Sequence, residues 1–147
     1  MDAANPIDVL NRLLVLHHRS LPAYLDYASP TWDRGDGRAR EVLQTIVAEQ
    51  QQMADRLGEM IIEGDGSVQF GGFPLRFTAY HDLSFDYLLP QLIEHQQRHV
   101  AAIEEGVAQL ASAPRAQSLA QEALEMAQQH LGLLEELQQA PRSAPAN

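Results

Sequence analysis

The sequence predicts an all-α protein, an antiparallel four-helix bundle with one long crossover. Apolar residues recur at the 3.6-residue period of a helix along four segments of the chain. Short connections join the first segment to the second and the third to the fourth, whereas a long Gly-rich stretch, residues 64–82, joins the second to the third. Short connections make neighbouring helices antiparallel, and the long crossover lets the third helix run parallel to the second.

The first two helices are bounded by cap and proline signals. The first is expected to begin at Asn5–Pro6, because Asn is a favoured N-cap and Pro suits the first helical position. It is expected to run to Ser29–Pro30 as one helix, kinked near His18 because Pro22 removes a backbone hydrogen bond. The second helix is expected from near Arg38 to just before the segment EGDG.

The crossover has too little periodicity for a helix, and we expect its aromatic residues to pin it to the bundle. These residues are Phe70, Phe73 and Phe77. The third helix is expected to begin near Asp82 or Ser84, both good caps, and to tolerate Pro90 in its early turns. The fourth is expected over residues 117–139. The sequence therefore predicts one domain, residues 1–140, and a disordered Pro- and Ala-rich tail, residues 141–147.

Composition narrows the function classes. The 147-residue chain is 45% hydrophobic, which is enough for one packed core. It has no cysteine, so disulfides, thiolate zinc sites and iron–sulfur clusters are excluded. A net charge of −10 disfavours nucleic acid and anionic lipid as partners. No apolar run approaches the roughly 20 residues of a membrane span, and no signal peptide is visible, so a soluble cytoplasmic protein is expected.

Polar residues occupy the faces that should be buried. In the stretch LIEHQQRHVAAI, which begins at Leu92, Gln96 and His99 share a helical face with Val100 and Ile103. The central inward positions of the other helices can be placed by the same periodicity. They are His17 in the first helix, Gln50 and Met53 in the second, and Ala127 and His130 in the fourth. We therefore expect a polar layer at the centre of the bundle.

Helix order, crossover and residue pattern over residues 6–139 resemble the ferritin-like superfamily. The resemblance implies a pair of metal ions held by a Glu from each of two helices and a Glu-x-x-His from each of the other two. At the equivalent positions this sequence has the residues named above, and His130 alone matches a family ligand type. Glu49 is the most plausible surviving carboxylate, whereas Glu94 is expected on the opposite face. The resemblance also implies a homodimer.

Two interpretations of the polar layer stay open. In the first, Gln and His side chains hydrogen-bond each other or buried water. In the second, His17, His99 and His130 bind a single transition-metal ion, iron, copper or zinc, with Gln50, Gln96 or Glu49 nearby. Met53 would favour copper(I), although core filling is its simplest role. His95 lies four residues before His99, a spacing that can clamp zinc, but we expect it to be solvated.

The sequence thus predicts a ferritin-like protein that lacks a working di-iron site and acts through self-association or partner binding. Exposed aromatic residues are expected to build that interface: Tyr24, Tyr27, Trp32, Phe70 and Phe73. The alternative is a His-based metal-binding protein for storage, sensing or redox work. A third hypothesis, a metal-dependent oxidoreductase retained from the ferritin-like family, requires carboxylates that the pattern does not supply. The sequence does not identify a cofactor, and both no cofactor and a single transition-metal ion, iron, copper or zinc, are compatible with it.

Overall fold

A computed structural model describes residues 5–28, 37–80 and 83–139, and every regular element in these ranges is helical. The elements are α1 (Pro6–His18), α2 (Leu21–Ala28), α3 (Gly37–Glu63), the 3₁₀ helix η2 (Leu75–Tyr80), α4 (Phe85–Gln109) and α5 (Pro114–Gln139). The predicted all-α class is confirmed. Within the described ranges, every helix is too short or too polar to cross a lipid bilayer.

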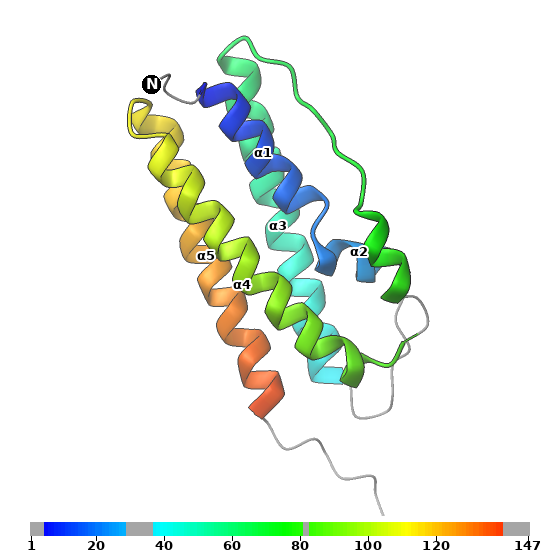
Figure 1. Ribbon diagram of the computed structural model, residues 1–147. Helices are drawn as coiled ribbons and strands as arrows, with labels where there is room; N and C mark the ends of the chain where they lie inside the picture. The colour runs from blue at the N-terminus through cyan, green and yellow to red at the C-terminus, as the bar shows by residue number, and fades with distance from the viewer. Residues whose placement is uncertain (1–4, 29–36, 81–82, 140–147) are drawn as a thin grey trace, which may run out of the picture.

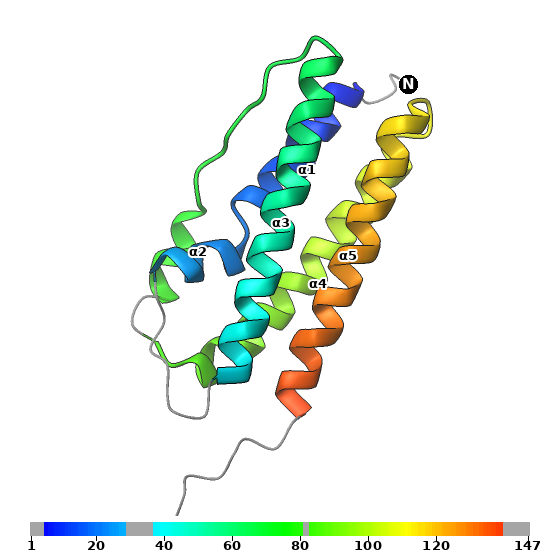
Figure 2. The same ribbon diagram turned by 180° about the vertical axis from the view of Figure 1, so that it is seen from behind.

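The long helices α1, α3, α4 and α5 lie side by side (Figures 1 and 2). α3 runs back along α1, and the segment after α3 then returns along the length of the molecule to the start of α4. As a result α3 and α4 run in the same direction, and α5 runs back along α4. The closest packing is within these two consecutive pairs, α1 with α3 and α4 with α5.

The first predicted helix is two helices, so the expectation of one kinked helix is wrong. α1 ends at His18 and α2 begins at Leu21. Pro22 has no N–H to donate, and the hydroxyl of Ser20 accepts a hydrogen bond from the N–H of Ala23 at 3.2 Å, as an N-cap residue does. The chain therefore breaks and restarts, and we call this break the elbow. The expected end at Ser29–Pro30 lies outside the described residues.

The other helix boundaries are close to their predicted positions. α3 extends from Gly37 to Glu63, and Ser84 is the N-cap of α4, which contains Pro90 as expected. Asp82 and the tail after residue 139 lie outside the described ranges. α5 begins at Pro114, three residues before the expected start. A proline suits the first turn of a helix, where its missing N–H is not needed.

The crossover is packed against α1 and contains the helix η2, which the sequence did not predict. The amide of Asn11 donates to the carbonyl of Ser67 at 3.0 Å and accepts from the N–H of Gln69 at 2.8 Å. A Cβ on Gly71 would lie 2.8 Å from the side chain of Val15, so only glycine allows this approach. These contacts hold the segment along the outside of α1.

The aromatic residues of the crossover do not all pin it to the helices. Phe77 is 1% exposed and Phe73 is half-buried, but Phe70 is 66% exposed. The expectation for Phe70 is therefore wrong, although its ring still lies 5.5 Å from that of His18. Phe77 and Phe73 pack with Tyr24 of α2, so α2 covers this end of the crossover.

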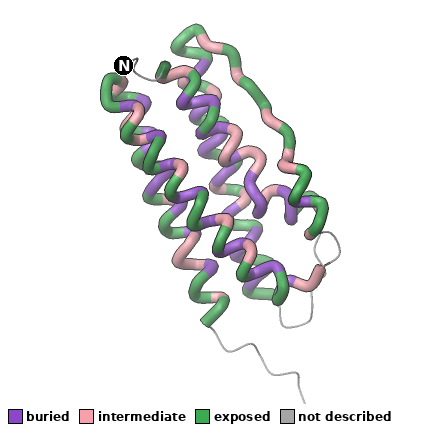
Figure 3. The backbone as a smooth tube through the Cα atoms, in the orientation of Figure 1, coloured by how far each residue is buried: buried purple, intermediate pink, exposed green. Residues whose placement is uncertain are grey.

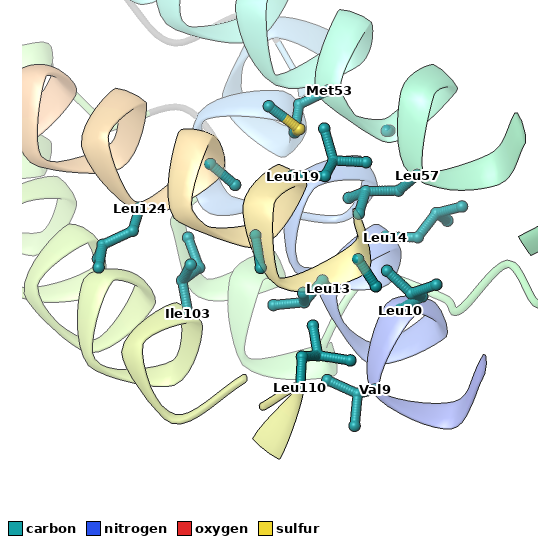
Figure 4. Packing of buried hydrophobic residues seen from close by; sticks show 14 of the residues in the cluster. Val9, Leu10, Leu13, Leu14, Met53, Leu57, Ile103, Leu110, Leu119 and Leu124 are labelled. Carbon is teal, nitrogen blue, oxygen red and sulfur yellow. The ribbon is translucent and has the colours of Figure 1, made fainter. Parts of the chain in front are cut away.

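The core is divided into two apolar clusters, and buried residues line the facing sides of the helices (Figure 3). The aliphatic cluster lies toward the α4–α5 turn and includes Val9, Leu10, Leu13, Leu14, Met53, Leu57, Ile103, Leu110, Leu119 and Leu124. Its side chains converge from α1, α3, α4 and α5 (Figure 4). The aromatic cluster lies toward α2 and η2 and includes Leu21, Tyr24, Ile46, Phe77, Phe85, Leu92, Ile93 and Leu134. The buried residues that separate the two clusters form the candidate site.

Candidate functional site

Six buried polar residues lie between the two apolar clusters, and we call them the polar layer. They are His17, Ser20, Gln50, Gln96, His99 and His130, none more than 3% exposed. On α3, for example, Ile46 belongs to the aromatic cluster and Met53 to the aliphatic cluster, with Gln50 between them. Each expected inward position is buried, as the periodicity predicts. Met53, however, lies in the aliphatic cluster (Figure 4), so its predicted role as core filler describes its surroundings better than a role as copper ligand.

His17 has one ring nitrogen committed to the backbone. Its Nδ1 lies 2.7 Å from the carbonyl oxygen of Leu13. A carbonyl can only accept, so Nδ1 carries the proton and Nε2 has a free lone pair. Nε2 is buried and has no hydrogen-bond partner. Burial lowers the pKa of His17 to about 4, against the opposing effect of the Leu13 carbonyl, so the ring is neutral at pH 7.

His130 has the same arrangement with a carboxylate in place of the carbonyl. Its Nε2 lies 2.9 Å from Oε1 of Glu49, whose side chain is 46% exposed and reaches in from the surface of α3. With the ring neutral, Nε2 donates to the carboxylate and Nδ1 holds the lone pair. Nδ1 is buried without a partner. Burial lowers the pKa of His130, and Glu49 opposes that shift.

His99 lies between the other histidines and has no partner on either ring nitrogen. Its ring is 5.1 Å from the ring of His17, centroid to centroid, in an edge-on contact. On its other side the ring of His95 stacks at 6.1 Å. Burial, followed by the neighbouring histidines, holds the pKa of His99 well below its usual range.

His95 is not the solvated side chain that we expected. Its Nε2 accepts a hydrogen bond from the N–H of Leu21 at 3.2 Å, at the start of α2. Its ring also packs edge-on against Phe77 at 5.7 Å. Burial lowers the pKa of His95 to about 4, which keeps the accepting nitrogen free of a proton. His95 therefore secures the elbow from α4.

The two glutamines bond outward from the layer. Oε1 of Gln50 accepts from the hydroxyl of Ser20 at 2.6 Å, and Nε2 of Gln96 donates to the carbonyl of Ala127 at 2.9 Å. The expected Gln–His hydrogen bonds are therefore absent among the described residues. The second polar atom of each glutamine has no partner. Ser20 was missed at the sequence level, although a serine two residues before a proline is a recognisable helix-start signal.

Six buried atoms of the polar layer thus have no hydrogen-bond partner. They are His17 Nε2, Gln50 Nε2, Gln96 Oε1, His99 Nδ1 and Nε2, and His130 Nδ1. Buried polar groups in folded proteins are nearly always paired with protein or water, so a cluster of orphaned atoms in one layer indicates a place for a ligand or for ordered water.

The residues do not fit a pair of iron ions. Glu49 brings one carboxylate to the layer, whereas Glu94 is exposed and paired with Arg98 at 2.9 Å, and Glu125 is also exposed. Neutral amides cannot balance the charge of two buried cations. A single ion fits the three imidazoles better, although a rearrangement is required. Nowhere in residues 5–28, 37–80 and 83–139 do three His, Asp or Glu side chains already lie close enough together to hold a metal ion.

The aromatic residues expected at an interface differ widely in exposure. Tyr24 is buried in the aromatic cluster at 6% exposure, so its assignment to a surface is wrong. Tyr27 is 79% exposed and Phe70 66% exposed, whereas Phe73 is half-buried. Trp32 lies outside the described residues.

No protein-family model, curated protein or solved structure matches this chain. The basis for assigning a function is therefore the helix arrangement and the polar layer.

Proposed function

We propose that the chain is a ferritin-like four-helix bundle that binds one transition-metal ion in its polar layer, through His17, His99 and His130. The ferritin-like assignment is supported by the crossover, which leaves α3 and α4 running in the same direction (Figure 1). The metal assignment is supported by the orphaned ring nitrogens. A water-filled layer is the competing interpretation, because water can satisfy the same atoms.

The observation that carries the proposal is that His17 and His130 each use one ring nitrogen for a hydrogen bond to a group outside the polar layer. Metal-ligating histidines almost always donate their second ring N–H to a carboxylate or a backbone carbonyl, which fixes the tautomer. His17 does so to the carbonyl of Leu13, and His130 to Glu49. Each bond leaves an unprotonated, unpartnered ring nitrogen buried in the layer. Water filling alone requires no such pairing on both residues.

The positions and charges of the histidines support a single ion. Two imidazoles on one tetrahedral zinc ion have ring centroids about 5 Å apart, because the Zn–N bond is about 2 Å long. His17 and His99 are separated by 5.1 Å. His130 would turn about its side-chain torsions to join them, and Glu49 would supply a negative charge beside it. Neutral imidazoles suit zinc, copper or iron, and Met53 gives no particular support to copper.

The proposed role is metal storage or sensing. A bound ion would supply Lewis acidity and, if it were copper or iron, redox chemistry. The chain's own contribution is to keep three imidazoles neutral through burial and to exclude bulk water with an apolar cluster on either side. An oxidase of the two-iron type is not proposed, since Gln50 and Gln96 stand where carboxylates would be needed.

Zinc loading tests the proposal. Untagged protein, purified without chelators, is incubated with zinc and dialysed, and its metal content is measured. We expect one zinc per chain, lost in the double variant His17→Ala/His130→Ala and retained in His18→Ala, a matched change at the adjacent half-exposed histidine. Equal zinc in the double variant would refute this ligand set. If wild-type protein retains no zinc, the metal proposal is wrong and the polar layer is filled by water.

Self-association is a second candidate function, favoured by three strongly exposed apolar side chains. They belong to α2 and the crossover, which lie together in Figure 1: Tyr27 is 79% exposed, Phe70 66% and Leu75 86%. Sedimentation equilibrium should show a dimer that Tyr27→Ser and Phe70→Ser weaken, with Tyr87→Ser on α4 as the control. A monomer at high concentration would exclude the predicted homodimer.

A cytoplasmic location also stays a prediction.

A further inference from the structure

A cavity of about 490 Å³ opens at the elbow between α1 and α2, and we call it the elbow pocket. α1 contributes His17 and His18 to its wall, α2 contributes Ala23, α3 contributes Val47 and Gln51, and the crossover contributes Phe73. Residues from four segments thus surround one opening. Because the helix is interrupted at Arg19 and Ser20, no continuous helical surface closes this side of the core.

The inner wall of the elbow pocket is also the edge of the polar layer. His17 is 1% exposed, yet it lines the pocket, and its ring contacts that of His99 inside the layer. On α3, exposed Gln51 lines the pocket while its neighbour Gln50 is buried in the layer. A small solute in the pocket is therefore one side chain away from the orphaned ring nitrogens.

A second cavity, of about 560 Å³ between α1 and α4, provides a contrast. It is lined by Leu13 of the aliphatic cluster and by Ala102 and Gly106 of α4, and no polar-layer residue contributes to it. Its volume is comparable, and Asp8, Arg12 and Glu105 also line it, but its fully buried apolar side chains, Val9 and Leu13, belong to the aliphatic cluster. The position of the elbow pocket, and not its size, is what relates it to the candidate site.

The outer wall of the elbow pocket is held by Arg19. Its Nε donates to the carbonyl of Gly71 in the crossover at 2.5 Å, and its guanidinium lies 5.0 Å from the centroid of the Phe73 ring. The crossover is thereby fixed across the outside of the opening. Arg19 and Asp26 both line the pocket, and Asp26 of α2 offers the one carboxylate there to an incoming cation. The net charge of −10 favours the approach of cations in general.

We propose that the elbow pocket is the route by which a divalent transition-metal ion reaches His17 and the polar layer, with Phe73 as its outer wall. This inference rests on the metal binding proposed above. The interruption at Ser20 then has a functional consequence, because a continuous helix from Pro6 to Ala28 would cover the layer at this point. Narrowing the pocket should slow loading without changing the number of ions bound.

Stopped-flow zinc loading of the full chain, followed by competition with a chromophoric chelator, tests the route. Ala23→Phe narrows the elbow pocket, and Ala102→Phe makes the same change at a half-buried alanine of the second cavity. We expect Ala23→Phe to slow loading by roughly tenfold, with an unchanged final zinc content, and Ala102→Phe to load at the wild-type rate. Phe73→Ala removes the outer wall and should speed loading, which tests the route even if Ala23→Phe fails to fold.

Three other outcomes would contradict the proposed route or the proposed function. Loading of Ala23→Phe and Phe73→Ala at the wild-type rate would show that the ion enters elsewhere. Equal slowing by Ala102→Phe would show that entry follows general opening of the fold and not the pocket. Wild-type protein that never takes up zinc would overturn the proposed function itself, whereas normal zinc content with unaltered rates would overturn the route alone.

Discussion

The aliphatic cluster and the polar layer lie on the same helices and are equally buried, yet their atoms are satisfied differently. In the aliphatic cluster, Leu57 and Ile103 are 0% exposed and need nothing beyond close packing. In the polar layer, His99 is just as enclosed, but neither of its ring nitrogens has a partner. An unpaired buried polar group costs about 1–3 kcal/mol. The cluster therefore stabilises the fold, and the layer weakens it unless a ligand or water occupies it.

The largest effect is expected from a cavity in the aliphatic cluster. Leu57→Ala should lower the free energy of unfolding by about 2–5 kcal/mol, because buried methyl groups are lost and the neighbours relax only in part. Urea denaturation of the metal-free protein measures the change. Leu57→Met keeps the volume and should cost less than about 1.5 kcal/mol. Equal effects of the two variants would show that the cluster is loosely packed.

Acid should lower the free energy of unfolding through the histidines of the polar layer, whereas the aliphatic cluster has no group that titrates. The pKa of His17 is about 4 in the folded state and 6.5 as its ordinary value, so the unfolded chain binds the proton more readily. Stability is therefore complete above pH 6.5, falls as the pH drops toward 4, and for His17 alone the loss is on the order of 3 kcal/mol. The pKa values of His95 and His99 shift in the same direction.

Urea unfolding measured at several pH values between 7 and 4 checks this expectation. His17→Gln should show a shallower loss of stability with acid, whereas Leu57→Ala should follow the wild-type slope at a lower level. An unchanged slope in His17→Gln would mean that this ring is not held neutral by burial.

Removing unpartnered polar atoms from the polar layer should raise the free energy of unfolding, whereas removing apolar atoms from the aliphatic cluster lowers it. His99→Leu eliminates two unpartnered nitrogens and should raise the stability of the metal-free protein by about 1–3 kcal/mol. Thermal and urea unfolding in the presence of a chelator measure it. A marked loss of stability would show that ordered water already satisfies His99.

The smallest effect is expected at the surface. Arg56 makes two hydrogen bonds to Glu122, at 3.1 and 3.0 Å, and joins α3 to α5, but both side chains are about half exposed. Arg56→Ala should change the free energy of unfolding by less than about 1 kcal/mol, and less still at high salt. A loss as large as that of Leu57→Ala would contradict the division between core and surface assumed above.

Periodicity was enough to predict α3, α4 and α5 and the inward positions, but not the partners of the side chains. The stripe that places Gln96 and His99 inside α4 is a local property of the sequence, and both residues are buried. Their hydrogen bonds depend on other helices. Gln96 donates to a carbonyl of α5, and His99 is enclosed by rings from α1 and its own helix. These contacts require the packed structure.

The elbow was missed for a similar reason. Pro22 is compatible with either a kink or a break, and the sequence alone does not decide between them. The break is secured by Ser20, which bonds to Gln50 of α3, and by His95 of α4, which accepts from Leu21 at a separation of 74 residues. Likewise η2 follows a stretch of the crossover that is fixed to α1 through Asn11. Helical periodicity does not predict this contact, because it joins residues far apart in the sequence.

Anomalous diffraction from crystals grown with zinc tests the central claim most directly. We expect one peak at the zinc edge between Nε2 of His17, Nδ1 of His130 and a ring nitrogen of His99, with the bond from His17 to Leu13 retained and the ring of His130 turned toward the ion. Ordinary water density in the layer, with no anomalous peak there, would contradict the claim that this polar layer is a metal centre.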